Sequence, residues 1–194
     1  MIDKFATEQT SLDLYVKHVK RGVPAKMMPK IIVAEGIKLR EIDGGEKFSG
    51  ALVKSPSGVM YININKNIDN TGRKNFTLAH ELGHFALQHH LHTASFLCSE
   101  NEISEDDEAI SDQEKEANYF ASCFLLPRNR VVSEFTKWFQ WRISPNGRVF
   151  LNITPHGKSY SEWKAISNTL QNKFDVSTTA LKIRLVELVL INDF

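Results

Sequence analysis

Residues 73–91 read RKNFTLAHELGHFALQHHL, and this stretch decides the fold. Its apolar residues recur every three or four positions, which is the spacing of a helix with a buried face. These residues are Phe76, Ala79, Leu82, Ala86 and Leu87. Asn70 precedes the pattern, and an asparagine side chain is a good N-cap. The sequence therefore predicts a buried helix that is entered near Asn70 and runs through residues 76–91.

Within this helix, His80, Glu81 and His84 form the pattern H-E-x-x-H. Residues four apart on a helix share a face, so both imidazoles can bind one metal ion at about 2.0–2.1 Å. Glu81 lies on the flank of that face, where it can accept a proton from a water whose pKa the ion has lowered to roughly 7. The pattern predicts a zinc site with His80 and His84 as metal ligands and Glu81 as the catalytic base.

A chance match has to be weighed, because the chain contains seven histidines. Its odds are on the order of one in a hundred for a motif that fixes three positions. The context lowers these odds, since two histidines and a glutamate on the buried side of an apolar helix destabilise the fold unless a metal ion satisfies them. Metal binding is therefore favoured over ordinary surface imidazoles.

A catalytic zinc site usually has three protein ligands and one open position for water. Glu114 opens an apolar helix predicted over residues 113–126, and it shares a face with Ala117 and Ala121. Small residues let two helices approach closely, so Glu114 is the candidate third ligand. Asn118 follows one turn later, and its amide oxygen can accept the free ring N–H of a ligand histidine.

Glu116 is the alternative third ligand. Its neighbours three and four positions on are Tyr119 and Phe120, which are bulkier than the alanines that share a face with Glu114. Either glutamate taken alone also fits an exposed charge near a helix N-terminus. We therefore favour Glu114 and keep Glu116 as the rival.

The whole sequence predicts an α+β fold, in which a small β-sheet packs on a helical bundle that carries the H-E-x-x-H helix and a helical C-terminal part follows. The β-type segments, separated by Gly and Pro turns, are residues 37–42, 48–53, 59–64 and 149–153. Further helices are predicted over residues 12–20, 23–36, 131–141, 161–173 and 178–191. We expect a zincin-like metallopeptidase core over residues 1–127 and a helical region, helix-turn-helix-like at its end, over residues 128–194.

The composition is that of a soluble folded chain, with 194 residues, 42% hydrophobic and 24% charged. The net charge of +1 gives no global basic field, so direct binding to nucleic acid is not expected. Residues 1–15 lack the apolar core of a signal peptide, and no stretch reaches the roughly 20 apolar residues that cross a bilayer. We therefore expect a cytoplasmic protein without membrane contact.

Three more histidines, His89, His90 and His92, follow the motif. His92 lies beyond the helical turn that holds the ion, so we expect all three side chains to face solvent. A peptidase also needs a hydrogen-bond donor for the oxyanion of its transition state. Tyr61, Tyr119 and His90 are candidates, and the sequence does not choose among them.

Two motifs in this order resemble the ImmA/IrrE metallopeptidase family. Residues 73–84 resemble that family's arginine and F-T-x-A leading into H-E-L-G-H, and residues 114–127 resemble its E-x-x-A-N-x-F-A followed by L-x-P. The resemblance covers residues 25–127 well and the remainder weakly. It implies that Glu114 is the third zinc ligand, and that the chain is similar to cytoplasmic peptidases of bacteria or mobile elements that cleave a repressor.

Our hypothesis is a zinc-dependent endopeptidase that hydrolyses a peptide bond in a specific protein. The resemblance suggests a transcriptional repressor of a phage, a mobile element or a stress response as the partner. We expect one Zn²⁺ ion and no small-molecule ligand, although a His-His-Glu site also accepts Mn²⁺ or Fe²⁺. The alternative is a non-catalytic, antitoxin-like binding module in which the ion only joins two helices. A fourth protein ligand such as Cys98 or His90 would favour that alternative, because structural zinc sites are usually closed.

Overall fold

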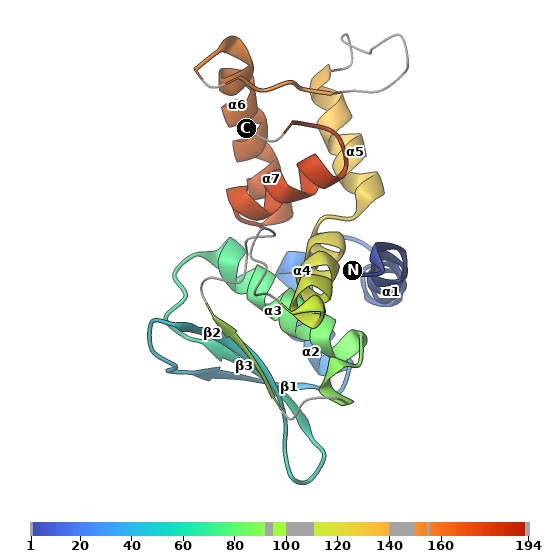
Figure 1. The fold of residues 1–194 in the computed structure, drawn as a ribbon, viewed down its shortest axis with the longest axis vertical. Helices are drawn as coiled ribbons and strands as arrows, with labels where there is room; N and C mark the ends of the chain where they lie inside the picture. The colour runs from blue at the N-terminus through green and yellow to red at the C-terminus, as the bar shows by residue number, and fades with distance from the viewer. Residues whose placement is uncertain (1, 92–94, 100–110, 140–149, 155, 193–194) are drawn as a thin grey trace.

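The computed structural model confirms the predicted α+β class, with a small sheet, helices packed on it and a helical C-terminal part. It describes residues 2–91, 95–99, 111–139, 150–154 and 156–192, without the side chains of residues 95–99 and 139. The sheet lies at one end of the longest axis and the C-terminal helices lie at the other (Figure 1). The helix that carries H-E-x-x-H lies between them.

Within the described part of the chain, the sheet has four strands in the order β1-β3-β2-β4. Their bounds are β1 Lys38–Ile42, β2 Phe48–Lys54, β3 Met60–Asn65 and β4 Ser95–Ser99. β1 runs parallel to β3, whereas β2 runs antiparallel to both β3 and β4. The three strands predicted before the motif helix are confirmed. β4 was not predicted, because its sequence, SFLCS, places three apolar residues in a row and shows no alternation.

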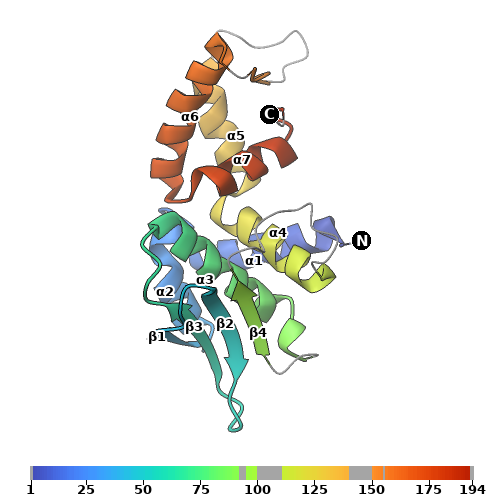
Figure 2. The same cartoon turned by 60° about the vertical axis from the view of Figure 1, so that its left-hand side comes forward.

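The motif helix is α3, Thr71–Ala86, and it packs on β2 and β3 with its buried face (Figure 2). Asn70 caps it as predicted, since its side-chain oxygen accepts the N–H of Arg73 at 2.9 Å. Helix α4, Asp112–Leu125, packs across α3 on the side away from the sheet. Ser111 caps α4 by accepting the N–H of Glu114 at 3.2 Å. α3 is therefore held between the sheet and α4.

The two helices come close where α3 carries Gly83. A Cβ atom at this position would lie 2.9 Å from Cδ1 of Phe120 and 3.3 Å from the backbone oxygen of Ala117. Any larger residue would push α4 outward, because buried atoms at these distances are already in contact. The missing side chain of Gly83 thus adds to the small size of Ala117 in bringing α4 against α3.

The N-terminal segment forms α1, Lys4–His18, the short 3₁₀ helix η1, Pro24–Met27, and α2, Met28–Ala34. α1 packs against α4. It starts before the predicted residue 12, because Asp3 caps it by accepting the N–H of Ala6 at 3.0 Å and its first turns show no apolar period. α2 ends before Gly36, whose φ of +78° favours glycine.

The C-terminal part contains α5, Arg128–Thr136, followed by the 3₁₀ turn η3, Lys137–Phe139, then α6, Lys158–Phe174, and α7, Thr178–Glu187. The β-type interpretation of residues 149–153 is wrong over its described part, because Leu151 makes only an isolated bridge to Ile191. Residues 140–149, where the helix predicted to reach residue 141 would end, lie outside the described residues. Among the described helices, none combines the length and apolarity needed to cross a membrane.

Close backbone contact joins the C-terminal part to the motif helix. A Cβ atom on Gly72 would lie 2.4 Å from the backbone nitrogen of Ser177, so the start of α3 touches the turn between α6 and α7. Asn75 donates a hydrogen bond to the backbone oxygen of Asp175 at 2.9 Å. Arg184, which is 1% exposed, donates to the backbone oxygen of Leu126 at 3.1 Å. The proposed division of the chain after residue 127 stays a prediction.

Candidate metal centre

Three predicted ligands converge between α3 and α4. The Nε2 atoms of His80 and His84 lie 2.9 Å apart. The carboxylate of Glu114 reaches both rings, with Oε2 at 3.1 Å from His80 Nε2 and Oε1 at 3.2 Å from His84 Nε2. One ligand atom from each residue lies within 4.8 Å of the others. Both histidines are buried, so the structure brings two imidazoles and one carboxylate to a single point inside the protein.

Asn118 lies behind His80. Its Oδ1 atom is 2.9 Å from His80 Nδ1. An amide oxygen only accepts hydrogen bonds, so Nδ1 of His80 carries the proton and Nε2 keeps a lone pair directed toward Glu114 and His84. This is the arrangement in which a histidine binds a metal ion through Nε2.

His89 lies behind His84, and the prediction that it faces solvent is wrong. It is only 5% exposed, and its Nδ1 atom lies 2.9 Å from His84 Nδ1. The reason is the chain turn at Gln88, whose φ of +62° ends the helical path after α3. The following 3₁₀ turn η2, His89–Leu91, directs His89 back under α3.

The remaining candidates of the sequence analysis have other contacts. Glu116, the rival third ligand, places Oε2 at 3.1 Å from His89 Nε2. His90 stacks on Phe85, with ring centroids 5.4 Å apart. The Tyr119 hydroxyl donates to Glu8 at 3.3 Å, and the Tyr61 ring lies under the guanidinium of Arg40. His92 lies outside the described residues.

Glu81 is fully buried on the flank of the two histidines, under strand β2. The strand comes close at Gly50, where a Cβ atom would lie 3.3 Å from Glu81 Oε1 and 2.6 Å from Thr77 Cγ2. Gly50 therefore makes room for the Glu81 carboxylate beside the sheet. This role could not be predicted from the sequence, because a single glycine inside a β-type segment does not reveal which helix lies above it.

Burial and the contacts among the side chains together set the charges of this centre. Desolvation lowers the pKa of His84 to about 4, although the neighbouring Glu114 carboxylate acts in the opposite direction. Burial would raise the pKa of Glu114, but its contacts with the His80 and His84 rings hold it well below the ordinary value of a glutamate. At neutral pH the centre thus contains a neutral His84 imidazole and an ionised carboxylate. These are the forms that bind a metal ion, so the donor set fits Zn²⁺.

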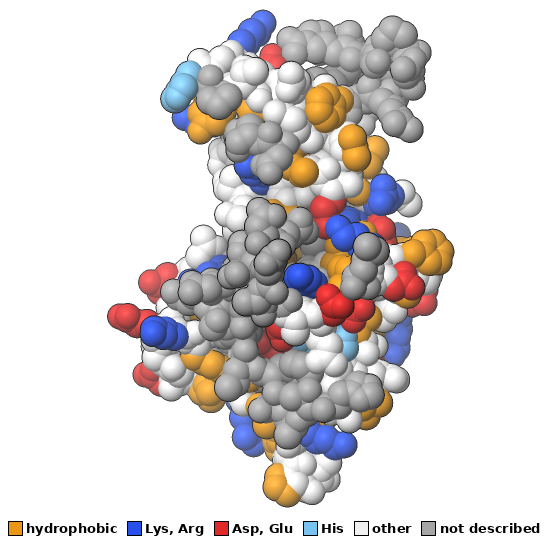
Figure 3. Space-filling model, in the orientation of Figure 1, with side chains coloured by type: hydrophobic (Ala, Val, Ile, Leu, Met, Phe, Trp, Pro, Cys, Tyr) orange, Lys and Arg blue, Asp and Glu red, His pale blue; other side chains and the backbone are white. Residues whose placement is uncertain are grey.

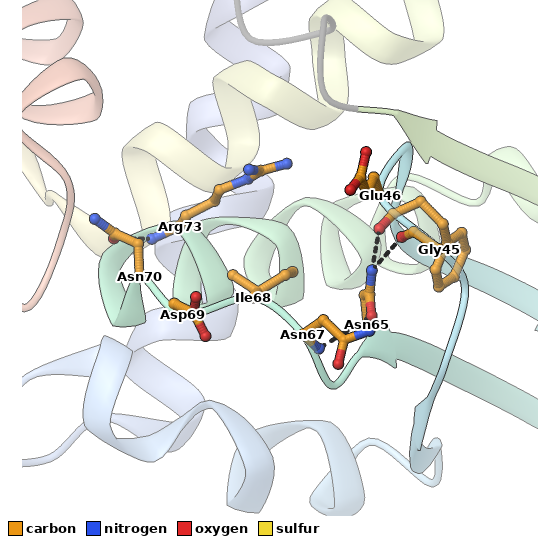
Figure 4. A pocket seen from close by; sticks show the side chains of 9 residues that line it. Gly45, Glu46, Asn65, Asn67, Ile68, Asp69, Asn70 and Arg73 are labelled. Atoms are coloured by element: carbon orange, nitrogen blue, oxygen red, sulfur yellow. Dashed lines mark hydrogen bonds between the residues drawn. The ribbon is translucent and has the colours of Figure 1, made fainter.

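A hollow of about 480 Å³ opens beside the N-terminal half of α3 (Figure 4). Glu46, Asp69 and Arg73 are among the side chains that line it. Arg73 donates a hydrogen bond to Ser49 Oγ at 3.0 Å, and Ser49 directly precedes Gly50. The hollow therefore lies along the same strand and helix that hold Glu81.

A model of the Peptidase_M78 family, described as the IrrE N-terminal-like domain, matches residues 34–137. The matched stretch contains the sheet, α3 and α4, and with them every residue of the candidate centre. A search of curated proteins gave no match.

Proposed function

Because the chain belongs to the IrrE N-terminal-like family of peptidases, we propose that it is a zinc-dependent endopeptidase that hydrolyses a peptide bond in a specific protein. The observation that carries this proposal is the convergence of His80, His84 and Glu114 on one buried point, with Glu81 beside it. Two imidazoles and one carboxylate are a common ligand set of catalytic zinc sites, which keep a further position for water or substrate.

Each residue has a distinct task in this proposal. His80, His84 and Glu114 would hold the ion, which when bound polarises the scissile carbonyl and lowers the pKa of water. Glu81 accepts the proton of the attacking water and transfers it to the leaving nitrogen. Asn118 holds the ring of His80 in the tautomer that directs Nε2 toward the ion.

The substrate is proposed to bind as an extended chain along β4. This strand ends the sheet order and also contacts α3, the helix that carries Glu81. An added strand satisfies its backbone groups on such an edge without requiring particular side chains. On the face shown in Figure 3, the described Lys and Arg side chains are interspersed with Asp and Glu, which suits a protein partner better than a polyanion.

For the physiological substrate we propose a transcriptional repressor in the cytoplasm. The chain and its Glu81→Gln variant would be expressed in the source cell, and new protein N-termini would be identified by terminal labelling and mass spectrometry. We expect new termini in a transcription factor with the wild type and none with the variant, and a chelator should abolish the cleavage. Cleavage by Glu81→Gln would refute the mechanism. Cleavage confined to other proteins would refute the repressor as substrate.

A further inference from the structure

A chain of three side chains leads outward from the candidate centre on the His84 side. His84 Nδ1 lies 2.9 Å from His89 Nδ1, and His89 Nε2 lies 3.1 Å from Glu116 Oε2. His84 is fully buried and His89 is 5% exposed, while the side chain of Glu116 is 27% exposed. The chain thus begins at a buried ring and ends at a carboxylate that reaches solvent.

When Glu116 is ionised and His89 is neutral, only one placement of protons satisfies the contacts of this chain. A carboxylate accepts, so His89 Nε2 carries a proton and donates it to Glu116. In a neutral His89 ring the Nδ1 atom is then an acceptor, and the proton shared with His84 must reside on His84 Nδ1. The Nε2 atom of His84 is therefore left with its lone pair, directed at His80 and Glu114.

The local fold explains why His89 reaches this position. α3 ends at Ala86, and the N–H of Gln88 bonds to the backbone oxygen of Phe85 at 3.0 Å. The left-handed conformation of Gln88 then reverses the chain, and η2 places His89 next to the last turn of α3. Strained backbone of this kind persists where surrounding contacts determine it, and the contacts here are His84 and Glu116.

We propose that His89 is a positioning residue for His84, and that Glu116 completes a carboxylate–imidazole–imidazole chain which fixes the tautomer and orientation of this metal ligand. The proposal rests on the proposed function, since it assigns His84 as a ligand. Hydrogen-bonded partners behind a ligand histidine raise its basicity and its affinity for the metal. The two ligands of α3 are then supported differently, because His80 meets the neutral amide of Asn118 whereas His84 is linked to a negative charge.

The first test is zinc affinity, measured by competition with a chromophoric chelator. His89→Leu fills the space but cannot accept the His84 proton, and we expect it to bind Zn²⁺ about 10- to 100-fold more weakly than the wild type. Glu116→Gln keeps an acceptor for His89 but loses the charge, so a smaller loss of about three- to tenfold is expected. His156→Leu and Glu134→Gln make the same chemical changes outside the centre and should bind like the wild type.

The second test separates positioning from packing. A glutamine at position 89 can accept from His84 with its amide oxygen and donate to Glu116 with its amide nitrogen, so His89→Gln should recover part of the affinity that His89→Leu loses. Nitrogen-detected NMR of the zinc-loaded protein should show the proton of His84 on Nδ1 in the wild type. In His89→Leu this signal should shift or broaden.

The outcomes are distinguishable from those of the proposed function. If both His89→Leu and Glu116→Gln bind zinc with wild-type affinity and cleave the substrate, this inference is overturned. The peptidase proposal then stays intact. Equal affinities of His89→Gln and His89→Leu would show that packing alone matters, which also overturns it. A wild-type chain that binds no zinc would overturn both proposals. Glu116 lies at the surface, so Glu116→Gln serves as the folded variant if His89→Leu does not fold.

Discussion

The candidate metal centre and the cluster around Arg184 are both buried and polar, yet their charges are balanced in different ways. In the cluster, Arg184 donates to Glu8 at 3.0 Å, to Glu187 at 3.2 Å and to the backbone oxygen of Leu126 at 3.1 Å. The cation, its counter-ions and their acceptors all come from the chain. Burial of Arg184 is therefore compensated within the protein.

At the metal centre the described contacts bring lone pairs together. With the Nδ1 protons of His80 and His84 directed to Asn118 and His89, the Nε2 atoms and the Glu114 carboxylate all present lone pairs to one point. Lone pairs at these distances repel one another unless a cation or a proton lies between them. Buried polar side chains alone therefore do not mark a functional site, whereas buried polar side chains that require an external cation do.

The largest expected effect is a loss of activity. The substitution that causes it stops the chemistry of the metal centre but leaves this centre and the Arg184 cluster folded. Glu81→Gln removes the proton acceptor, so peptide cleavage should fall by about 10²- to 10⁴-fold. The variant should still bind one zinc ion and unfold at the wild-type urea concentration. Cleavage assays on zinc-loaded protein check this, and undiminished cleavage would contradict the assignment.

The next effect falls on the Arg184 cluster alone. Arg184→Met leaves Glu8 and Glu187 without their buried cation, so the free energy of unfolding should drop by about 3 kcal/mol. This value is at the low end for a broken buried ion pair, because Glu8 is partly exposed. Zinc affinity should not change. Arg128→Met removes an exposed partner of Glu8 and should cost less than about 1 kcal/mol. Urea unfolding measures both, and equal losses would show that burial does not distinguish these arginines.

A smaller effect should connect packing to metal binding. Gly83→Ala places a methyl group 2.9 Å from the Phe120 ring, so overpacking should destabilise the protein by about 1–3 kcal/mol and move Glu114 away from the histidines. An unconstrained helix would instead gain up to about 1 kcal/mol from this change. Urea unfolding and zinc titration check the two consequences. A stabilised variant with unchanged zinc affinity would show that the helices are not in tight contact.

The smallest effect, taken per pH unit, is a pH dependence of the metal-free protein. The pKa of His84 lies near 4 in the folded chain and near 6.5 when unfolded, so the unfolded state binds more protons between these values. The free energy of unfolding should therefore fall as pH decreases from about 6.5 to 4, by up to about 1.4 kcal/mol per pH unit from this residue. His84→Gln should show a shallower slope in urea unfolding. An unchanged slope would assign the effect to other groups.

Much of this centre was readable from sequence because its signals are local. The spacing of His80, Glu81 and His84 fixes their positions on one helix, and the small residues that follow Glu114 identified the face of α4 that approaches it. The structure brings these residues together as that reasoning expected, while their chemical roles remain proposals.

The missed features depend on contacts that no periodic pattern encodes. His89 returns to the centre through a left-handed conformation at Gln88, which is a rare conformation for a residue other than glycine. Gly50 matters only because β2 passes over Glu81, and β4 is recognisable only once it pairs with β2. Local sequence propensity predicted helices and strands, whereas the tertiary contacts between them can be seen only in the folded structure.

X-ray absorption at the zinc edge of the purified wild-type protein tests the central claim most directly. We predict one zinc ion per chain, with two imidazole nitrogens at about 2.0–2.1 Å, carboxylate oxygen and a water, and no sulfur in its coordination sphere. A fourth protein ligand in place of the water, seen as a zinc–sulfur distance near about 2.3 Å or as a third imidazole beside the carboxylate, would instead indicate a closed structural site. A chain that retains no zinc would contradict the claim outright.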